Sequence, residues 1–475
     1  MKKKVKYLCI LCGLILLLSG CGTSQSLPTS KYDTESKFYY NELSDAEKAF
    51  YDQMKSVCEE LYWENVNPKK TTDQIGQEKY YYGEMELGEL DSYKAEWIAL
   101  VFYCSNPKYF FLSTDAYQLH SLINVDGKYG IVIDNEFSDR KKIDEYRDLL
   151  EAKTDEWLES LSVYNDDLEK ETAICRMIVD NIEYDYSIDS EESKREYFYA
   201  SNIIGGLING KSICSGYAKI AQYICNAAGI ESVYVLATAD GSHAWNMVKL
   251  YDEWYCLDTT WLDDGRPITP ANHNFNKSYE TFKQVDFGLS YHTVDGSFEL
   301  YEVPVPKCES DSVKGHELFT GNDGDFRVEG GILTEYSGSD RNIIIPGSVM
   351  DLDYYVLNKD VDIESFDVAD GNGYFSTIDG LLYTKDKTVL MRGPSLMEGE
   401  LSVPEGTKRI DYGAFAFTEQ LTEIRIPGSV RKIGENAFNG SENLRDIYFE
   451  GTKKSCEAID TENVVIPSEC EIHFQ

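Results

Sequence analysis

The chain is poor in basic residues, proline and cysteine. Its 475 residues contain 45 Lys and Arg against 83 Asp and Glu, so the formal net charge is −38 at pH 7. Such a charge repels phosphate backbones, and we therefore expect no nucleic-acid partner. Twelve prolines exclude a proline-rich chain, and twelve cysteines are too few for a disulfide-framed scaffold. Beyond the N-terminus, no apolar run is long enough to span a bilayer.

The apolar content and the length of the chain are sufficient for large packed cores. Hydrophobic residues make up 42% of the chain, which argues against global disorder. The length exceeds the size at which a single hydrophobic core stops growing. We therefore expect more than one domain.

The N-terminus indicates export. Four lysines precede the apolar segment 7–18, which ends in Leu18-Ser19-Gly20-Cys21. This pattern resembles a bacterial lipoprotein signal, and an ordinary secretion signal is the alternative. The resemblance implies that residues 1–20 are removed and that Cys21 becomes lipid-modified. We then expect a protein held on the extracellular face of the bacterial cell membrane, with residues 21–36 as a flexible stalk.

Residues 37–303 are predicted to form one domain of α+β type. Apolar residues at helical spacing dominate 37–183, where Ser44 and Glu47 form a capping box at the start of the first long helix. Further helices are predicted over 138–161, about 168–182 and 215–228. Three β-rich runs follow this last helix, at 231–238, 243–250 and 253–261, so helices lead into an antiparallel sheet.

The C-terminal third is repetitive. Residues 304–325 are polar and aperiodic, which predicts a linker, and the domain 326–475 follows it. Leu421, Ile424 and Ile426 recur as Leu444, Ile447 and Phe449, at a shift of 23 residues. This period is typical of leucine-rich repeats, whose units must stack to bury their apolar faces. The segment resembles the bacterial cell-surface type of repeat and implies a short β-rich solenoid. Residues 326–400 are less regular, and a generic β-sandwich is the alternative.

Three residues form a candidate catalytic cluster. Cys214 lies where the helix 215–228 begins, and unpaired N–H groups at a helix N-terminus favour a thiolate and an oxyanion. His243 opens the second β-rich run. If Tyr251-Asp252 is a two-residue hairpin turn, Leu250 pairs with Glu253, and Asp258 then shares a sheet face with His243. The predicted roles are nucleophile for Cys214, base for His243 and its orienting acid for Asp258.

The same three segments resemble the core motifs of the transglutaminase-like superfamily. The motifs are NGKSICSGYAKIAQYICNAAGI, SHAWNMVKL and EWYCLDTTW, in the order Cys, His, Asp, and the run 181–185 before them also resembles bacterial members. The resemblance implies a papain-like fold and carries the three roles to Cys214, His243 and Asp258. It also implies a side-chain oxyanion donor before Cys214, which the sequence does not locate.

The function predicted from the sequence is cysteine acyl transfer at the cell surface, with the repeats serving for targeting or binding. The thiol would attack an amide of a protein or cell-wall peptide substrate, and water or an amine would then resolve the thioester. The alternatives are a surface adhesion protein, with the repeats as its binding part, and an envelope protein whose triad is idle. No cofactor or metal is expected, because the histidines lack metal-ligand spacing. Eight further cysteines have no assigned pairing: 58, 104, 175, 225, 256, 308, 456 and 470.

Overall fold

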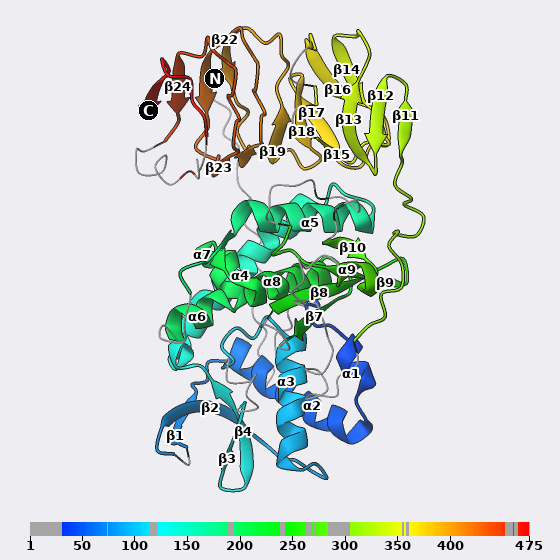
Figure 1. The fold of residues 1–475 in the computed structure, drawn as a ribbon. Helices are drawn as coiled ribbons and strands as arrows, with labels where there is room; N and C mark the ends of the chain where they lie inside the picture. Colours follow the sequence, from blue (N-terminus) through cyan, green and yellow to red (C-terminus); the bar gives the residue numbers. More distant parts are fainter. Residues whose placement is uncertain are drawn as a thin grey trace, which may run out of the picture.

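The protein has two parts, an α+β body and a β-solenoid that lies against one side of it (Figure 1). The structure is a computed structural model. It describes residues 31–73, 75–113, 121–188, 194–237, 243–262, 268, 272, 274–283, 305–353, 356–357, 361–451, 459 and 464–474. The predicted signal and the lipid site at Cys21 lie outside these residues. Within the described residues, no helix combines the length and apolarity needed to cross a bilayer.

The body begins with helices around a small sheet. Ser44 caps α2 and forms the predicted capping box with Glu47. The four-stranded sheet has the order β1-β2-β4-β3 and was missed in the sequence, where this region was read as mostly helical. Its strands are short and rich in Tyr and Thr, which favour pleated structure. The elements are α1 (Phe38–Glu42), α2 (Asp45–Trp63), β1 (Lys69–Thr72), β2 (Glu78–Met85), α3 (Ser92–Ser105), β3 (Leu122–Val125) and β4 (Lys128–Ile133).

The central layer packs one helix on a second antiparallel sheet, of order β10-β9-β8-β7. Helix α8 (Cys214–Ala227) contacts both β7 and β8. Tyr251 and Asp252 form the β8–β9 turn with φ of 48° and 70°, and Leu250 pairs with Glu253 as predicted. The strands are β7 (Ser232–Ala237), β8 (His243–Leu250), β9 (Glu253–Leu257) and β10 (Phe275–Lys277).

Helices enclose this layer on its other side. The long predicted helices are α4 (Arg140–Leu161) and α5 (Asp167–Asn181). Both begin at aspartate N-caps, Asp139 and Asp166, whose side chains accept backbone N–H groups. Helix α5 packs on α8. The remaining elements are η2 (Asn135–Phe137), β5 (Glu183–Tyr184), α6 (Lys194–Ala200), α7 (Ile203–Asn209), β6 (Lys211–Ser212) and α9 (Tyr279–Phe282).

The C-terminal part is a β-solenoid. Its parallel sheet β20-β22-β24-β25 pairs Ser402 with Arg425 and Arg425 with Tyr448, which is the predicted 23-residue repeat. The less regular part before it also folds into strands. They are β11 (Gly321–Asp323), β12 (Phe326–Glu329), β13 (Ile332–Tyr336), β14 (Asn342–Ile345), β15 (Asp351–Leu352), β16 (Ser365–Val368), β17 (Phe375–Ile378), β18 (Leu381–Thr384), β19 (Val389–Arg392), β20 (Gly399–Ser402), β21 (Arg409–Ile410), β22 (Leu421–Ile426), β23 (Lys432–Ile433), β24 (Asp446–Phe449) and β25 (Glu471–Phe474).

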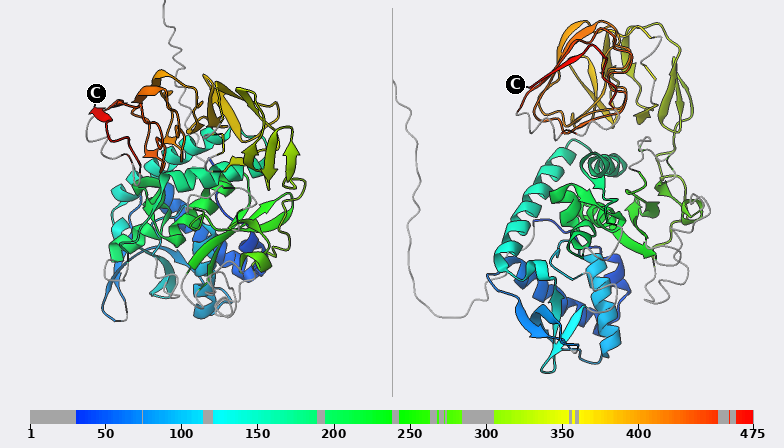
Figure 2. Two further views of the ribbon diagram at one scale, coloured as in Figure 1. Left: turned by 45° about the horizontal axis from the view of Figure 1, so that its top comes forward. Right: turned by 60° about the vertical axis from the view of Figure 1, so that its left-hand side comes forward.

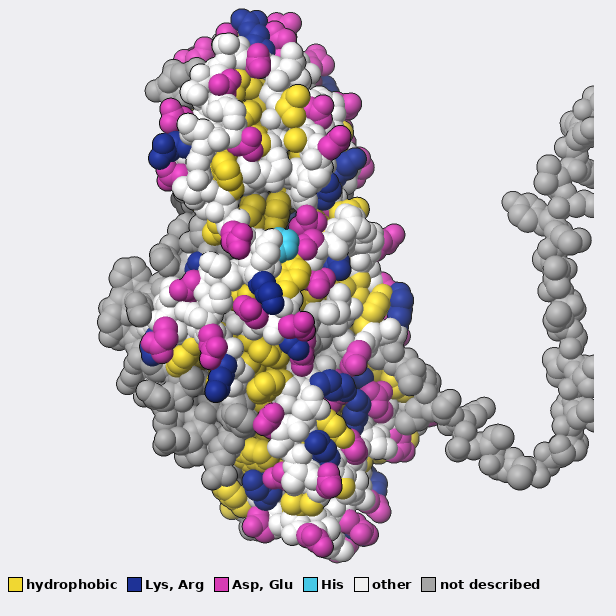
Figure 3. Space-filling view, turned by 90° about the vertical axis from the view of Figure 1, so that its right-hand side faces the viewer, with side chains coloured by type: hydrophobic (Ala, Val, Ile, Leu, Met, Phe, Trp, Pro, Cys, Tyr) yellow, Lys and Arg dark blue, Asp and Glu magenta, His cyan; other side chains and the backbone are white. Residues whose placement is uncertain are grey.

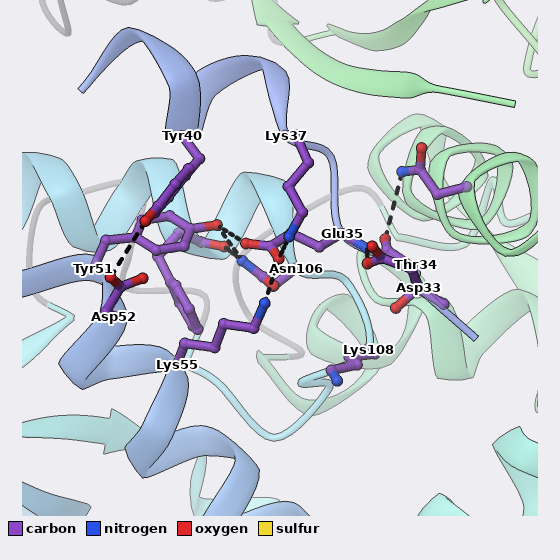
Figure 4. Close-up of polar contacts among 12 residues, drawn as sticks. Asp33, Thr34, Glu35, Lys37, Tyr40, Tyr51, Asp52, Lys55, Asn106 and Lys108 are labelled. Carbon is purple, nitrogen blue, oxygen red and sulfur yellow. Dashed lines mark hydrogen bonds and ion pairs between the residues drawn. The ribbon is translucent and has the colours of Figure 1, made fainter. Parts of the chain in front are cut away.

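Two predicted boundaries need correction. Strand β11 lies within 304–325 and pairs with β12, so the linker ends before residue 321, and Gly324 and Asp325 form the hairpin turn between the two strands. The predicted stalk 21–36 is also too long. Thr34, Glu35 and Ser36 are buried, because polar contacts fix this segment to the body (Figure 4).

Glu35 is the centre of these contacts. Its carboxylate accepts hydrogen bonds from Tyr51 (2.7 Å) and Lys55 (2.5 Å), and it pairs with Lys37. Burial acts to raise the pKa of Glu35, but the hydrogen bonds from the two lysines outweigh it, so the pKa lies below its usual value. The segment before α1 is therefore part of the folded body.

The solenoid lies against α5, on the side of the body opposite the sheet β1–β4 (Figures 1 and 2). Arg176 of α5 pairs with Asp351 of β15 at 2.7 Å. Asp180 of α5 pairs with Arg409 of β21, which also binds Asp411 at 2.7 Å. A cavity of about 470 Å³ lies between α4, α5 and the solenoid. Because ion pairs with little solvent exposure join the two parts, the repeats are docked on the body.

Candidate active site

The structure brings Cys214, His243 and Asp258 together. Nε2 of His243 lies 2.6 Å from Oδ2 of Asp258, and the Cys214 side chain is hydrogen-bonded to the same imidazole. With Nε2 on the carboxylate, Nδ1 is the ring nitrogen left for the thiol. Asp258 is fully buried and His243 nearly so, whereas Cys214 is partly exposed. Of the three residues, Cys214 is therefore the one that is open to solvent, while His243 and Asp258 are shielded.

The acid is held by its own turn. Oδ1 of Asp258 accepts the backbone N–H groups of Thr260 (2.9 Å) and Trp261 (3.3 Å). Its backbone N–H donates to the carbonyl of Asn274, which continues the pairing of β9 with β10. The rigid carboxylate leaves its second oxygen for His243. In the Asp-Thr-Thr-Trp motif, the backbone N–H groups of the third and fourth residues thus hold the carboxylate of the first.

The imidazole is held in an aromatic setting. Trp245 stacks on His243 and Trp261 meets it edge-on, with ring centroids about 6 Å away in each case. Burial acts to lower the pKa of His243, but the Asp258 carboxylate and the Cys214 side chain outweigh it and raise the pKa to about 10. The imidazole is therefore protonated at neutral pH, and its positive charge lies within hydrogen-bond reach of the Cys214 side chain.

The helix start is shaped by close backbone contacts. Ile213 caps α8 without a side-chain hydrogen bond, and Cys214 is the first helical residue. A Cβ atom at Gly216 would lie 2.4 Å from the carbonyl oxygen of Ala200, so only glycine fits there. Asn246 of β8 donates to the carbonyls of Ala218 (2.8 Å) and Val233 (3.3 Å). The glycine and the asparagine of the two motifs thereby fix the helix against the sheet.

Tyr184 is a site residue that the sequence analysis missed. Its hydroxyl is hydrogen-bonded to the Cys214 backbone and lies near the charges of Cys214 and Asp258, and burial raises the pKa of Tyr184 to about 12. The strand β5, which carries it, pairs with β6 directly before α8. The sequence signal for this segment was the resemblance of the run 181–185 to bacterial members of the superfamily. It marked this segment without showing which side chain reaches the helix start.

Potential metal ligands occur elsewhere. Asp446, Glu471 and His473 have ligand atoms within 4.8 Å of one another on β24 and β25. Spacing along the sequence missed this group, because the strands are one repeat apart. His473 already pairs with Asp446 at 2.7 Å. This group is in the solenoid and is not part of the triad.

Comparisons with known proteins agree with this architecture. Residues 156–259 match the family model of the transglutaminase-like superfamily, and residues 398–464 match that of the BspA type leucine rich repeat region, in six copies. The chain thus carries a transglutaminase-like domain and BspA-type leucine-rich repeats.

The curated relatives and solved structures that match cover only parts of the chain. Kyphoscoliosis peptidase of Mus musculus is 33% identical over 108 residues, which are 20% of this chain and 16% of that protein. The Homo sapiens protein is 31% identical over 137 residues, 26% and 20% of the two chains. The chain thus spans a fifth or less of these relatives.

Two solved structures illustrate the two parts. A transglutaminase crystal structure (TGase) is 18% identical, covers 33% of this chain and 50% of its own, and has a TM-score of 0.23. A leucine rich cell surface protein of Faecalibacterium prausnitzii A2-165 is also 18% identical, covers 26% and 51%, and has a TM-score of 0.19.

Proposed function

We propose that this protein is a surface-associated cysteine acyl-transfer enzyme. It acts on an amide of a protein or cell-wall peptide. The observation that supports this most is that Cys214, a partly exposed residue at a helix start, has its side chain hydrogen-bonded to an imidazole that a buried carboxylate holds. A merely structural cysteine has no need of this arrangement. The names of the curated relatives, which are peptidases, point in the same direction.

The proposed reaction has two stages. The Cys214 thiolate attacks the amide carbonyl carbon, and the resulting oxyanion is stabilised by the Tyr184 hydroxyl, whose oxygen already accepts the Cys214 backbone N–H. His243 gives its proton to the leaving amine, and a thioester remains on Cys214. In the second stage, His243 takes a proton from water or from an amine, which attacks the thioester. Water yields hydrolysis and an amine yields a cross-link, and the first stage is common to both.

A lipid anchor is part of the proposal. Modification of Cys21 would attach the chain to the membrane, and the segment before residue 31 would separate the body from it. Acidic side chains are scattered over both parts of the molecule on the face in Figure 3, and the net charge is −38. An anionic lipid surface therefore repels the folded protein. We expect the body to stay away from the membrane, within reach of substrates in the envelope.

The test compares two thiols of one chain. Iodoacetamide is added at pH 6–8, and peptide mass mapping follows alkylation of Cys214 and of Cys470, which is also partly exposed. We expect Cys214 to react at least ~10-fold faster, because its side chain is hydrogen-bonded to the protonated imidazole of His243. His243→Ala should remove this difference and leave Cys470 unchanged. Equal rates for the two thiols in the unmodified protein would contradict the proposal.

A second candidate is an adhesion protein whose solenoid binds another surface. It is favoured by large apolar side chains exposed on the solenoid, at Ile344 (56%), Ile472 (43%) and Phe474 (43%). Replacing all three with Ser should abolish binding to cells or matrix and leave Cys214 alkylation unchanged. Unchanged binding of the triple variant would count against this candidate. An inert Cys214 in a well-folded chain would instead favour it over the enzyme.

A further inference from the structure

Two buried cysteines from distant parts of the chain meet beside the sheet of the candidate active site. Cys256 lies in β9, just before Asp258, and Cys308 lies in the segment 305–320, which connects the body to the solenoid. Their side chains are hydrogen-bonded to each other. Cys256 is fully buried and Cys308 is 5% exposed. The proposed reaction of Cys214 uses neither thiol.

The backbone holds the two residues in place independently of their side chains. Cys256 is the register partner of Lys277 in β10. The N–H of Tyr279, just beyond that strand, donates to the carbonyl of Cys308 at 2.9 Å. Asp311 then accepts the N–H of Ser278 at 2.9 Å. The segment 277–279 therefore bridges the two cysteine backbones, so the thiols are already in position to react.

Access to the two sulfurs is unequal. Cys308 lines an open cavity of about 460 Å³, together with Lys307, Glu309 and Tyr279, whereas Cys256 does not line it. Burial raises the pKa of Cys256 well above its ordinary value. A small disulfide reagent in the cavity therefore lies next to Cys308, whereas Cys256 is fully buried and is not among the lining residues.

We propose that Cys308 and Cys256 are the attacking and the resolving thiol of a disulfide that fastens the connecting segment to β9. The Cys308 thiolate attacks one sulfur of an external disulfide and releases one thiol, which leaves a mixed disulfide on Cys308. The Cys256 sulfur then attacks the Cys308 sulfur, and its proton passes to the departing thiolate, which leaves as the second thiol. Two electrons pass from the cysteine pair to the external disulfide, which is reduced to two thiols.

The disulfide would join the strand of the triad acid to the chain that leads into the solenoid. It closes a loop of roughly 50 residues, long enough for the cross-link to restrict the unfolded chain substantially. Oxidation in the cell depends on the proposed surface location, since external disulfides persist outside the reducing cytosol. The reaction itself does not depend on it and is tested on the purified full-length chain.

The experiment uses oxidised glutathione as the external disulfide. The unmodified protein, Cys256→Ser and Cys308→Ser are incubated with it, free thiols are blocked under denaturing conditions, and peptides are mapped by mass without reduction. We expect a linked 256–308 peptide in the unmodified protein, and its loss on reduction. Cys256→Ser should accumulate a glutathione adduct on Cys308. Cys308→Ser should carry at least tenfold less adduct on Cys256, because the cavity does not reach that sulfur.

Controls separate this proposal from the others. Cys58→Ser removes a buried thiol of α2 and should keep the linked peptide, and circular dichroism verifies that each variant is folded. Absence of the linked peptide in the folded, unmodified protein would overturn the proposal. So would equal adduct on Cys256 in Cys308→Ser. Alkylation of Cys214 is measured on the same samples, so a failure of the pair is distinguished from a failure of the proposed enzyme.

Discussion

The ion pair between α5 and the solenoid permits a quantitative prediction. The side chains of Arg176 and Asp351 are 13% and 8% exposed and lie 2.7 Å apart. Removing one partner of a buried pair costs about 3–5 kcal/mol, because a charge is left buried without its partner. Asp351 also accepts the N–H of Ile268 at 3.3 Å, so the lower end applies. We expect Arg176→Met to weaken docking by about 3 kcal/mol, or about a hundredfold in the opening equilibrium.

The same helix supplies a matched control. Lys170 pairs with Asp167 on α5 at 3.1 Å, with side chains 25% and 48% exposed. Lys170→Met removes the same charge from a largely solvated pair and should cost about 0.3 kcal/mol, or less than twofold. Amide hydrogen exchange in peptides that contain β13 and β15 measures the opening. The double variant Arg176→Met/Asp351→Leu should regain much of the lost protection.

Two outcomes would refute this reasoning. If Arg176→Met and Lys170→Met exchange at the same rate, the buried pair does not hold the solenoid on the body. If the double variant exchanges as fast as Arg176→Met, the lost protection comes from a missing packing contact of the arginine and not from a buried Asp351 carboxylate without a partner. Each result is a ratio of rates between variants of the same full-length chain.

Three further predictions concern single groups. Burial raises the pKa of Glu171 to about 8 from 4.5. Between these pH values the folded state holds a proton that the unfolded state releases, so the free energy of unfolding falls as the pH rises. Glu171→Gln should abolish this pH dependence, measured by urea unfolding. The pKa of His243 is also raised, but His243 is a base, so the stability that it contributes is present below pH 6.5 and is lost as the pH rises towards 10. Asp258→Asn should shift the imidazole titration, followed by NMR, to lower pH. Tyr184→Phe should slow acylation of Cys214 by p-nitrophenyl acetate ~10–100-fold. It should leave alkylation by iodoacetamide unchanged, because alkylation forms no oxyanion. Equal slowing of both reactions would exclude the oxyanion role of Tyr184.

The sequence predicted those features that local patterns determine. The β8–β9 register followed from a two-residue turn at Tyr251-Asp252, which leaves one pairing of the flanking strands. That register placed His243 and Asp258 on one face, and the structure has them in contact. The 23-residue repeat likewise predicted the pairing of β22 with β24. In each case a short-range signal determines a longer-range contact.

Contacts without a local signal were missed. The hydrogen bond of Tyr184 to the Cys214 backbone depends on how β5 meets β6, and no spacing encodes that distance. The pair Asp180–Arg409 joins residues more than two hundred positions apart, each of which looks like an ordinary surface charge in the sequence. The burial of Glu35 was hidden in the same way within a polar segment. Such contacts follow from tertiary packing alone.

Docking of the repeats changes how the targeting hypothesis must be tested. Deletion of residues 326–475 is the simplest test of whether the repeats bind another surface, and it presupposes that the thiol chemistry stays intact. In the structure this deletion would expose the face of α5 that carries Arg176 and Asp180, and α5 packs on the helix that begins with Cys214. Loss of reactivity in a truncated chain would therefore not show that the repeats bind substrate. Substitutions on the outward side of the solenoid, which leave the α5 contacts in place, separate binding from catalysis.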